Sequence, residues 1–204
     1  MNPSVYWYLA RAGGLTAWCL LWASIVWGLL LSTRLGGRRP GAAWLLDLHR
    51  FLGGTAVVFV ALHVGGLMMD RFVSFGPADV FVPFASSWRP GAVAWGVVAG
   101  YLVAAIEATS LLRRWLPRRW WHRVHETSFV VFGCSAVHAF SAGSDHGNVV
   151  VQWSAIAMAA VVVFLTTYRA FARPSGPVRV AADPSSAGPA ELVAAGRVAP
   201  ERQE

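Results

Sequence analysis

The chain has 204 residues, of which 56% are hydrophobic and only 13% are charged, and its mean hydropathy is +0.50. Soluble domains carry about 25% charged residues, so this composition argues against a soluble enzyme. All 17 basic side chains are arginines, and they outnumber the 10 acidic ones to give a net charge of +7. Because the arginines lie between long apolar runs, they indicate orientation in a membrane and not binding to nucleic acid.

Five apolar stretches are each long enough to cross a bilayer, which takes about 20 residues. In chain order they are 8–32, 44–69, 91–112, 121–141 and 149–168. The sequence therefore predicts an all-α integral membrane bundle of five transmembrane helices, which forms one domain over residues 1–172. Residues 173–204 are rich in Pro, Ala, Gly and Ser, and we expect a disordered cytoplasmic tail there.

Arginines gather in the loops on one side of this predicted bundle. They follow the first, third and fifth spans: Arg34, Arg38, Arg39, Arg113, Arg114, Arg118, Arg119, Arg169, Arg173 and Arg179. The loops on the other side hold only Arg71 and Arg89. The positive-inside rule then places the N-terminus outside and the C-terminus in the cytoplasm. The use of Arg in place of Lys favours a bacterium, so the expected location is the bacterial cytoplasmic membrane, as a multi-pass protein.

Four of the six histidines lie on two predicted spans. His49 and His63 are 14 residues apart on 44–69, and His125 and His138 are 13 residues apart on 121–141. Both spans run from the cytoplasm outwards, so the imidazoles form two levels about 20 Å apart. Polar side chains are costly in a membrane, and facing neutral imidazoles are able to clamp a porphyrin iron. The pattern predicts haem binding at these levels. Whether the chain binds one haem or two stays open. Polar packing or a proton path is the alternative.

The two spacings differ in helical geometry. A 14-residue step returns to within about 40° of the same helix face, whereas a 13-residue step is about 140° off. The span 121–141 therefore needs a local wide turn or a tilt, for which Gly133 is a candidate position, or else its two haems lie at different azimuths. His122 competes with His125 as the inner histidine of this span. We favour His125, because it lies deeper and its spacing of 13 better matches the 14 between His49 and His63, and the choice stays open.

Small and cationic residues add candidate contacts to the haems. Gly53 lies four residues after His49 on the same helix face and lets a flat macrocycle come close, although small residues also let bare helices pack. Arg11 and Arg89 lie at the outer side and are candidates to bind the haem propionates. Arg11, inside a span, is alternatively a partner in a polar core. We expect no catalytic residue, because bis-histidine iron has no open position.

The segments DLHRFLGGTAVVFVALH and WHRVHETSFVVFGCSAVH resemble the transmembrane domain of the ferric reductase and NADPH oxidase superfamily. The resemblance covers about residues 5–170, and the histidine spacing is its specific part. It implies two b-type haems, with His49 paired with His125 on the inner one and His63 with His138 on the outer one. No GxGxxG motif occurs, so the chain resembles the haem core without the flavin and NADPH module.

The resemblance implies a di-haem transmembrane electron-transfer protein, either a ferric reductase-like oxidoreductase or the membrane subunit of one. Electrons pass from a cytoplasmic or membrane donor to an extracytoplasmic acceptor. A separate reductase, with a flavin supplied by that partner, or membrane quinol is the expected donor. Two alternatives stay open: a quinol-oxidising cytochrome b subunit of an extracytoplasmic reductase, and a non-redox transporter or scaffold that contains histidines.

Overall fold

The computed structural model describes residues 4–33, 42–70 and 75–171. The chain divides into two units, Met1–Phe171 and Ala172–Glu204, and every described element belongs to the first. The expected cytoplasmic tail lies outside the described residues. So do several of the arginines on which the expected orientation depends, namely Arg34, Arg38, Arg39, Arg71, Arg173 and Arg179.

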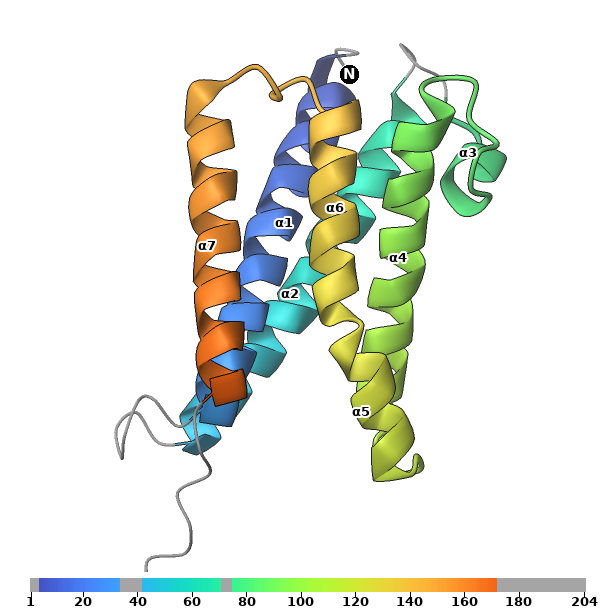
Figure 1. The fold of residues 1–204 in the computed structure, drawn as a ribbon. Coiled ribbons are helices and arrows are strands. Elements are labelled where there is room, and N and C mark those ends of the chain that lie inside the picture. Colours follow the sequence, from blue (N-terminus) through green and yellow to red (C-terminus); the bar gives the residue numbers. More distant parts are fainter. Residues whose placement is uncertain (1–3, 34–41, 71–74, 172–204) are drawn as a thin grey trace, which may run out of the picture. The chain divides into compact units, whose positions relative to one another are not determined.

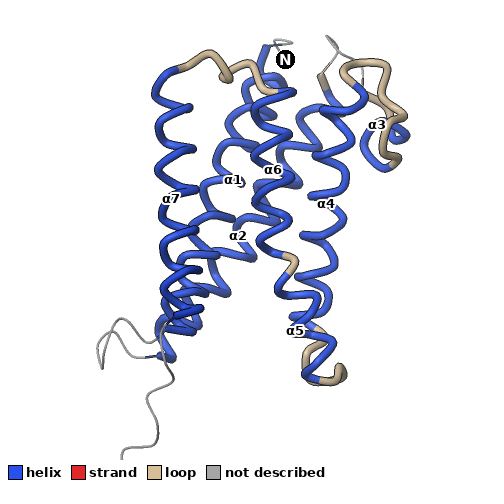
Figure 2. The backbone as a smooth tube through the Cα atoms, in the orientation of Figure 1, coloured by secondary structure: helices blue, strands red, loops and turns tan. Residues whose placement is uncertain are grey.

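All regular structure in the described residues is helical (Figures 1 and 2). The helices are α1 (Ser4–Thr33), α2 (Ala42–Met69), α3 (Pro77–Phe81), α4 (Pro90–Leu111), α5 (Arg118–Glu126), α6 (Ser128–Ala142) and α7 (Val149–Phe171). The all-α class predicted from the sequence is confirmed for these residues.

Helices α1, α2, α4 and α7 are long and apolar enough to cross a membrane. Large apolar side chains cover their outward faces, as in α7, where Val150 and Phe164 are 75% and 66% exposed. A soluble protein rarely leaves such continuous apolar surface in water, whereas a bilayer solvates it with lipid tails. The chain is therefore a multi-pass membrane protein.

The stretch 121–141, expected to be one continuous span, lies on two helices. Helix α5 ends at Glu126, and α6 begins at Ser128. At the break, the hydroxyl of Thr127 donates to the carbonyl oxygen of Val124 at 2.6 Å, and the Thr127 amide donates to the same oxygen at 3.1 Å. The 15 residues of α6 reach only about 22 Å at 1.5 Å per residue, less than the hydrocarbon core of a bilayer. Gly133, the candidate position for a wide turn or a tilt, lies inside α6.

Helix α1 packs antiparallel against α2, and α4 packs antiparallel against α6, so that α2 and α6 run in the same direction (Figure 1). Glycines set the distance between α1 and α2. A Cβ atom on Gly66 would lie 2.8 Å from the backbone nitrogen of Ala10, and one on Gly13 would lie 3.0 Å from the backbone nitrogen of His63. Small residues allow this approach of two backbones, which is how helices associate in lipid.

Two apolar clusters and one ion pair join the remaining elements. Ile25, Val26 and Leu29 of α1 pack against Val162 and Leu165 of α7. The segment before α3 packs on α4 through Phe75, Val93 and Val97. Arg11 of α1 makes a two-point ion pair with Asp145 in the α6–α7 connection, in which its Nε donates to Oδ2 at 2.7 Å. These contacts attach α7 to α1 and bring the helices into one bundle.

We predict that Gly66→Ala destabilises the bundle, because its methyl group overlaps the α1 backbone. Overpacking of this kind costs about 1–3 kcal/mol. Thermal unfolding in detergent, followed by circular dichroism, measures the loss. The neighbouring Gly65→Ala is the matched control, since a Cβ on Gly65 meets no atom within 4 Å. Equal stability of the two variants would contradict the close approach of α1 and α2.

Candidate functional site

The structure gathers four imidazoles into two pairs at different depths of the bundle. The rings of His49 on α2 and His125 on α5 have centroids 5.8 Å apart. Those of His63 on α2 and His138 on α6 have centroids 6.2 Å apart. All four side chains are half-buried. Each level thus joins one ring from α2 to one ring from a segment more than 70 residues later in the chain.

The two separations fit a metal ion bound between each pair of rings. Metal–nitrogen bonds of about 2 Å on opposite sides of one ion would put the two ring centroids about 6 Å apart. Among the described residues, no group of three or more His, Cys, Asp or Glu side chains gathers round a common point. Each level therefore offers two nitrogen ligands, the number that an iron already held by a porphyrin takes from a protein.

Three of the four imidazoles are fixed by a hydrogen bond to a helix backbone. In each, Nδ1 lies within hydrogen-bond distance of a main-chain carbonyl: His63 to Ala10 at 2.7 Å, His138 to Ala92 at 2.8 Å and His49 to Ser24 at 2.9 Å. A carbonyl oxygen only accepts, so the proton lies on Nδ1 and Nε2 keeps its lone pair. This is the arrangement of a metal-binding histidine, whose second nitrogen is held by an outer partner.

A glycine stands four residues after each of these carbonyls and lies against the bound ring. A Cβ atom on Gly14 would lie 2.8 Å from Nδ1 of His63, one on Gly28 would lie 3.4 Å from Cε1 of His49, and one on Gly96 would lie 2.7 Å from Nδ1 of His138. On a helix, the residue at i+4 covers the carbonyl of residue i. The missing side chain therefore opens the backbone to the imidazole.

These three glycines were not among the residues expected to border the histidines. The expected one, Gly53, faces Glu107 instead, with its Cβ position 3.0 Å from Oε1 of that carboxylate. Gly54 and Gly65 face open space, and Gly66 packs on α1. A signal for the missed glycines was present in the sequence. The pairs Ala10/Gly14 and Ser24/Gly28 repeat after 14 residues, the same interval that separates His49 and His63.

His122 and His125, between which the sequence left the choice open, lie in different surroundings. His125 is half-buried and its ring neighbours that of His49. His122 is exposed, and its Nε2 accepts a hydrogen bond from Nε of Arg118 at 3.4 Å. The geometry thus favours His125 as the partner of His49.

The two arginines proposed to bind haem propionates lie at the His63–His138 end of the bundle. Arg11 is engaged by Asp145, as described above. Arg89 donates from Nη1 to the carbonyl oxygen of Ser141 at 2.7 Å and lies over the ring of Trp88, 5.2 Å from its centroid. Both guanidinium groups thus brace the connections at this end, and a role with propionates stays a prediction.

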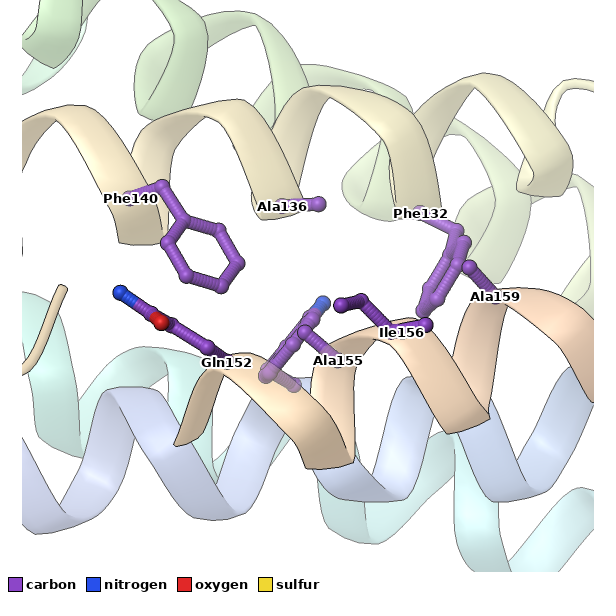
Figure 3. Close-up of a pocket in the computed structure, with 8 residues that line it drawn as sticks. Phe132, Ala136, Phe140, Gln152, Ala155, Ile156 and Ala159 are labelled. Carbon is purple, nitrogen blue, oxygen red and sulfur yellow. The ribbon is translucent and has the colours of Figure 1, made fainter. Parts of the chain in front are cut away.

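A separate cavity of about 400 Å³ lies between α6 and α7 (Figure 3). Phe132, Ala136 and Phe140 of α6 face Gln152 and Ile156 of α7 across it (Figure 3). Trp18 also lines the cavity, and its ring stacks on Phe132 at 6.2 Å. None of the four paired histidines lines it. It is therefore distinct from the histidine site.

No protein-family model matches the chain, and neither a curated protein nor a solved structure matches it. The geometry of the two histidine pairs is therefore the basis on which a function can be inferred.

If the His63–His138 level holds haem, we predict that Gly96→Ala weakens its binding there, because the added methyl group would displace the His138 ring from the Ala92 carbonyl. Loss of such an outer-shell contact costs about 10- to 100-fold in affinity. Titration of haem into the apoprotein, followed by the Soret absorbance, measures the effect. The control is Gly100→Ala, one turn further along α4, where a Cβ meets no atom within 4 Å. A normal affinity for Gly96→Ala would show that the ring does not depend on this glycine.

Proposed function

We propose that this chain is a b-type di-haem transmembrane electron-transfer protein, similar to the haem core of ferric reductases and NADPH oxidases. The observation that carries the proposal is the pair of facing imidazoles at each of two levels, with centroids 5.8 and 6.2 Å apart. His49 and His125 would hold the inner haem, and His63 and His138 the outer one. A metal-free polar core has no need of matched nitrogen pairs at two depths.

The residues of the chain supply binding and orientation. When bound, haem iron supplies one-electron chemistry between its ferrous and ferric states. The backbone hydrogen bonds of His49, His63 and His138 fix the tautomer and direct Nε2 away from the helix that accepts the bond. With haem bound, two imidazoles at each level would leave no ligand position for a substrate. The acceptor of the electrons would then react without binding at the metal.

The orientation proposed from the sequence is supported by the charges at the two ends of the bundle. At the His49–His125 end, Arg113, Arg114, Arg118, Arg119 and Arg123 occupy the α4–α5 turn and α5. At the other end, Asp145 neutralises Arg11. The positive-inside rule makes the arginine-rich end cytoplasmic and the N-terminus external. In this view the host membrane is the bacterial cytoplasmic membrane.

In the same proposal, α5 and α6 together make the fifth crossing. Helix α6 covers most of the hydrocarbon core, and α5 covers the cytoplasmic interface. Side chains of α5 are typical of that interface, since Trp120 lies under the guanidinium of Arg123 at 5.5 Å and is 53% exposed.

The electron donor acts at the cytoplasmic end and the acceptor at the outer end. A separate reductase, with its own flavin, and membrane quinol are the two donor classes. Reduction of the haems by added quinol in lipid nanodiscs would assign the chain to quinol-oxidising cytochromes b. Reduction only by a flavoprotein or a reduced flavin would show that the chain is the membrane partner of a separate, flavin-containing reductase.

We predict that the purified protein binds two haems and gives low-spin b-type bands in a reduced-minus-oxidised spectrum. His63→Ala removes one haem per chain, because it takes one ligand from the outer level only. His122→Ala is the matched control and keeps both, since the exposed His122 ring is not paired with His49. The pyridine haemochrome assay gives the ratio of haem to protein. A colourless wild-type protein would favour the non-redox transporter or scaffold and refute the proposal.

A further inference from the structure

The fourth imidazole differs from the other three in what holds it. Nδ1 of His125 is buried and has no hydrogen-bond partner among the described residues. His49, His63 and His138 each reach a main-chain carbonyl. A buried polar nitrogen without a partner is costly, so its occurrence in one ring of four calls for a physical reason.

Trp121, one turn before His125 on α5, is held against α4. Its Nε1 lies 3.4 Å from Oγ of Ser110.

Stacking replaces the missing hydrogen bond. The indole of Trp121 lies nearly parallel to the His125 ring, with centroids 4.8 Å apart and an angle of 21° between the planes. The guanidinium of Arg113 lies 4.4 Å from the centroid of the same indole. Arg113 therefore fixes Trp121, and Trp121 limits the rotation of His125.

We propose that Trp121 is the positioning residue of His125 and that the inner haem therefore has one ligand held by stacking and one by a hydrogen bond. This inference rests on the proposed function. A hydrogen bond from Nδ1–H to a carbonyl makes the imidazole more basic and favours ferric iron. The outer pair has two such bonds and the inner pair has one. The inner haem is accordingly the one with the more positive potential and the more easily displaced ligand.

The test compares Trp121→Leu, Trp121→Phe and Trp120→Leu in the purified holoprotein. Carbon monoxide binds ferrous haem only where an axial ligand is displaced. We expect Trp121→Leu to bind carbon monoxide at about half of its haem, the inner half, because His125 is no longer held. Trp121→Phe restores a ring for stacking and restores the low-spin spectrum. Trp120→Leu is the matched control and resembles wild type, since Trp120 contacts Arg123 and not His125.

The outcomes separate this inference from the proposed function. The outer haem, retained in the Trp121 variants, shows that these variants fold. If Trp121→Leu keeps two low-spin haems and binds no more carbon monoxide than Trp120→Leu, the positioning role is wrong while the di-haem function stands. A wild-type protein without haem overturns both.

Discussion

The hydrogen bond between an imidazole and a helix carbonyl is the interaction on which the arrangement of this bundle depends. A carbonyl inside a helix already accepts the amide of residue i+4, and the side chain of that residue normally covers it. Glycine at i+4 removes the cover and leaves the second lone pair of the oxygen open. A membrane helix thereby gains a polar contact for a neighbour without a polar side chain of its own, and without the cost of burying one.

The same interaction fixes the register of α1 against α2. Two histidines 14 residues apart on α2 bond to two carbonyls 14 residues apart on α1, at Ser24 and Ala10. Because the helices are antiparallel, a shift of one residue would break both bonds at once. The close approach at Gly13 and Gly66 lies at the same end as the His63 bond. Packing and polar contacts thus specify one register, although neither is strong alone in lipid.

The sequence predicted the elements of this fold that repeat along the chain. Length and apolar runs located the long helices α1, α2, α4 and α7, and parallel direction with similar spacing located the two levels of histidine. The carbonyl oxygens that hold the imidazoles could not be predicted in the same way. Every residue has a backbone carbonyl, and only a glycine one turn later distinguishes these three. The Arg11–Asp145 ion pair was also missed, since it joins a helix to a loop whose path depends on the tertiary fold. That His122 is exposed and His125 half-buried was likewise decided by the rotation of α5, which no local pattern reveals.

The break at Thr127 resolves the conflict between the 13-residue spacing and helical geometry. On one continuous helix, His125 and His138 would point about 140° apart, and only one would face α2. Placed at Thr127, the break lies two residues from His125 and turns α5 alone, so α6 remains regular around His138. His125 is also the one paired ring whose Nδ1 has no hydrogen-bond partner among the described residues. The ring that the break turns toward His49 is thus the ring that stacks on Trp121 instead of bonding to a helix backbone.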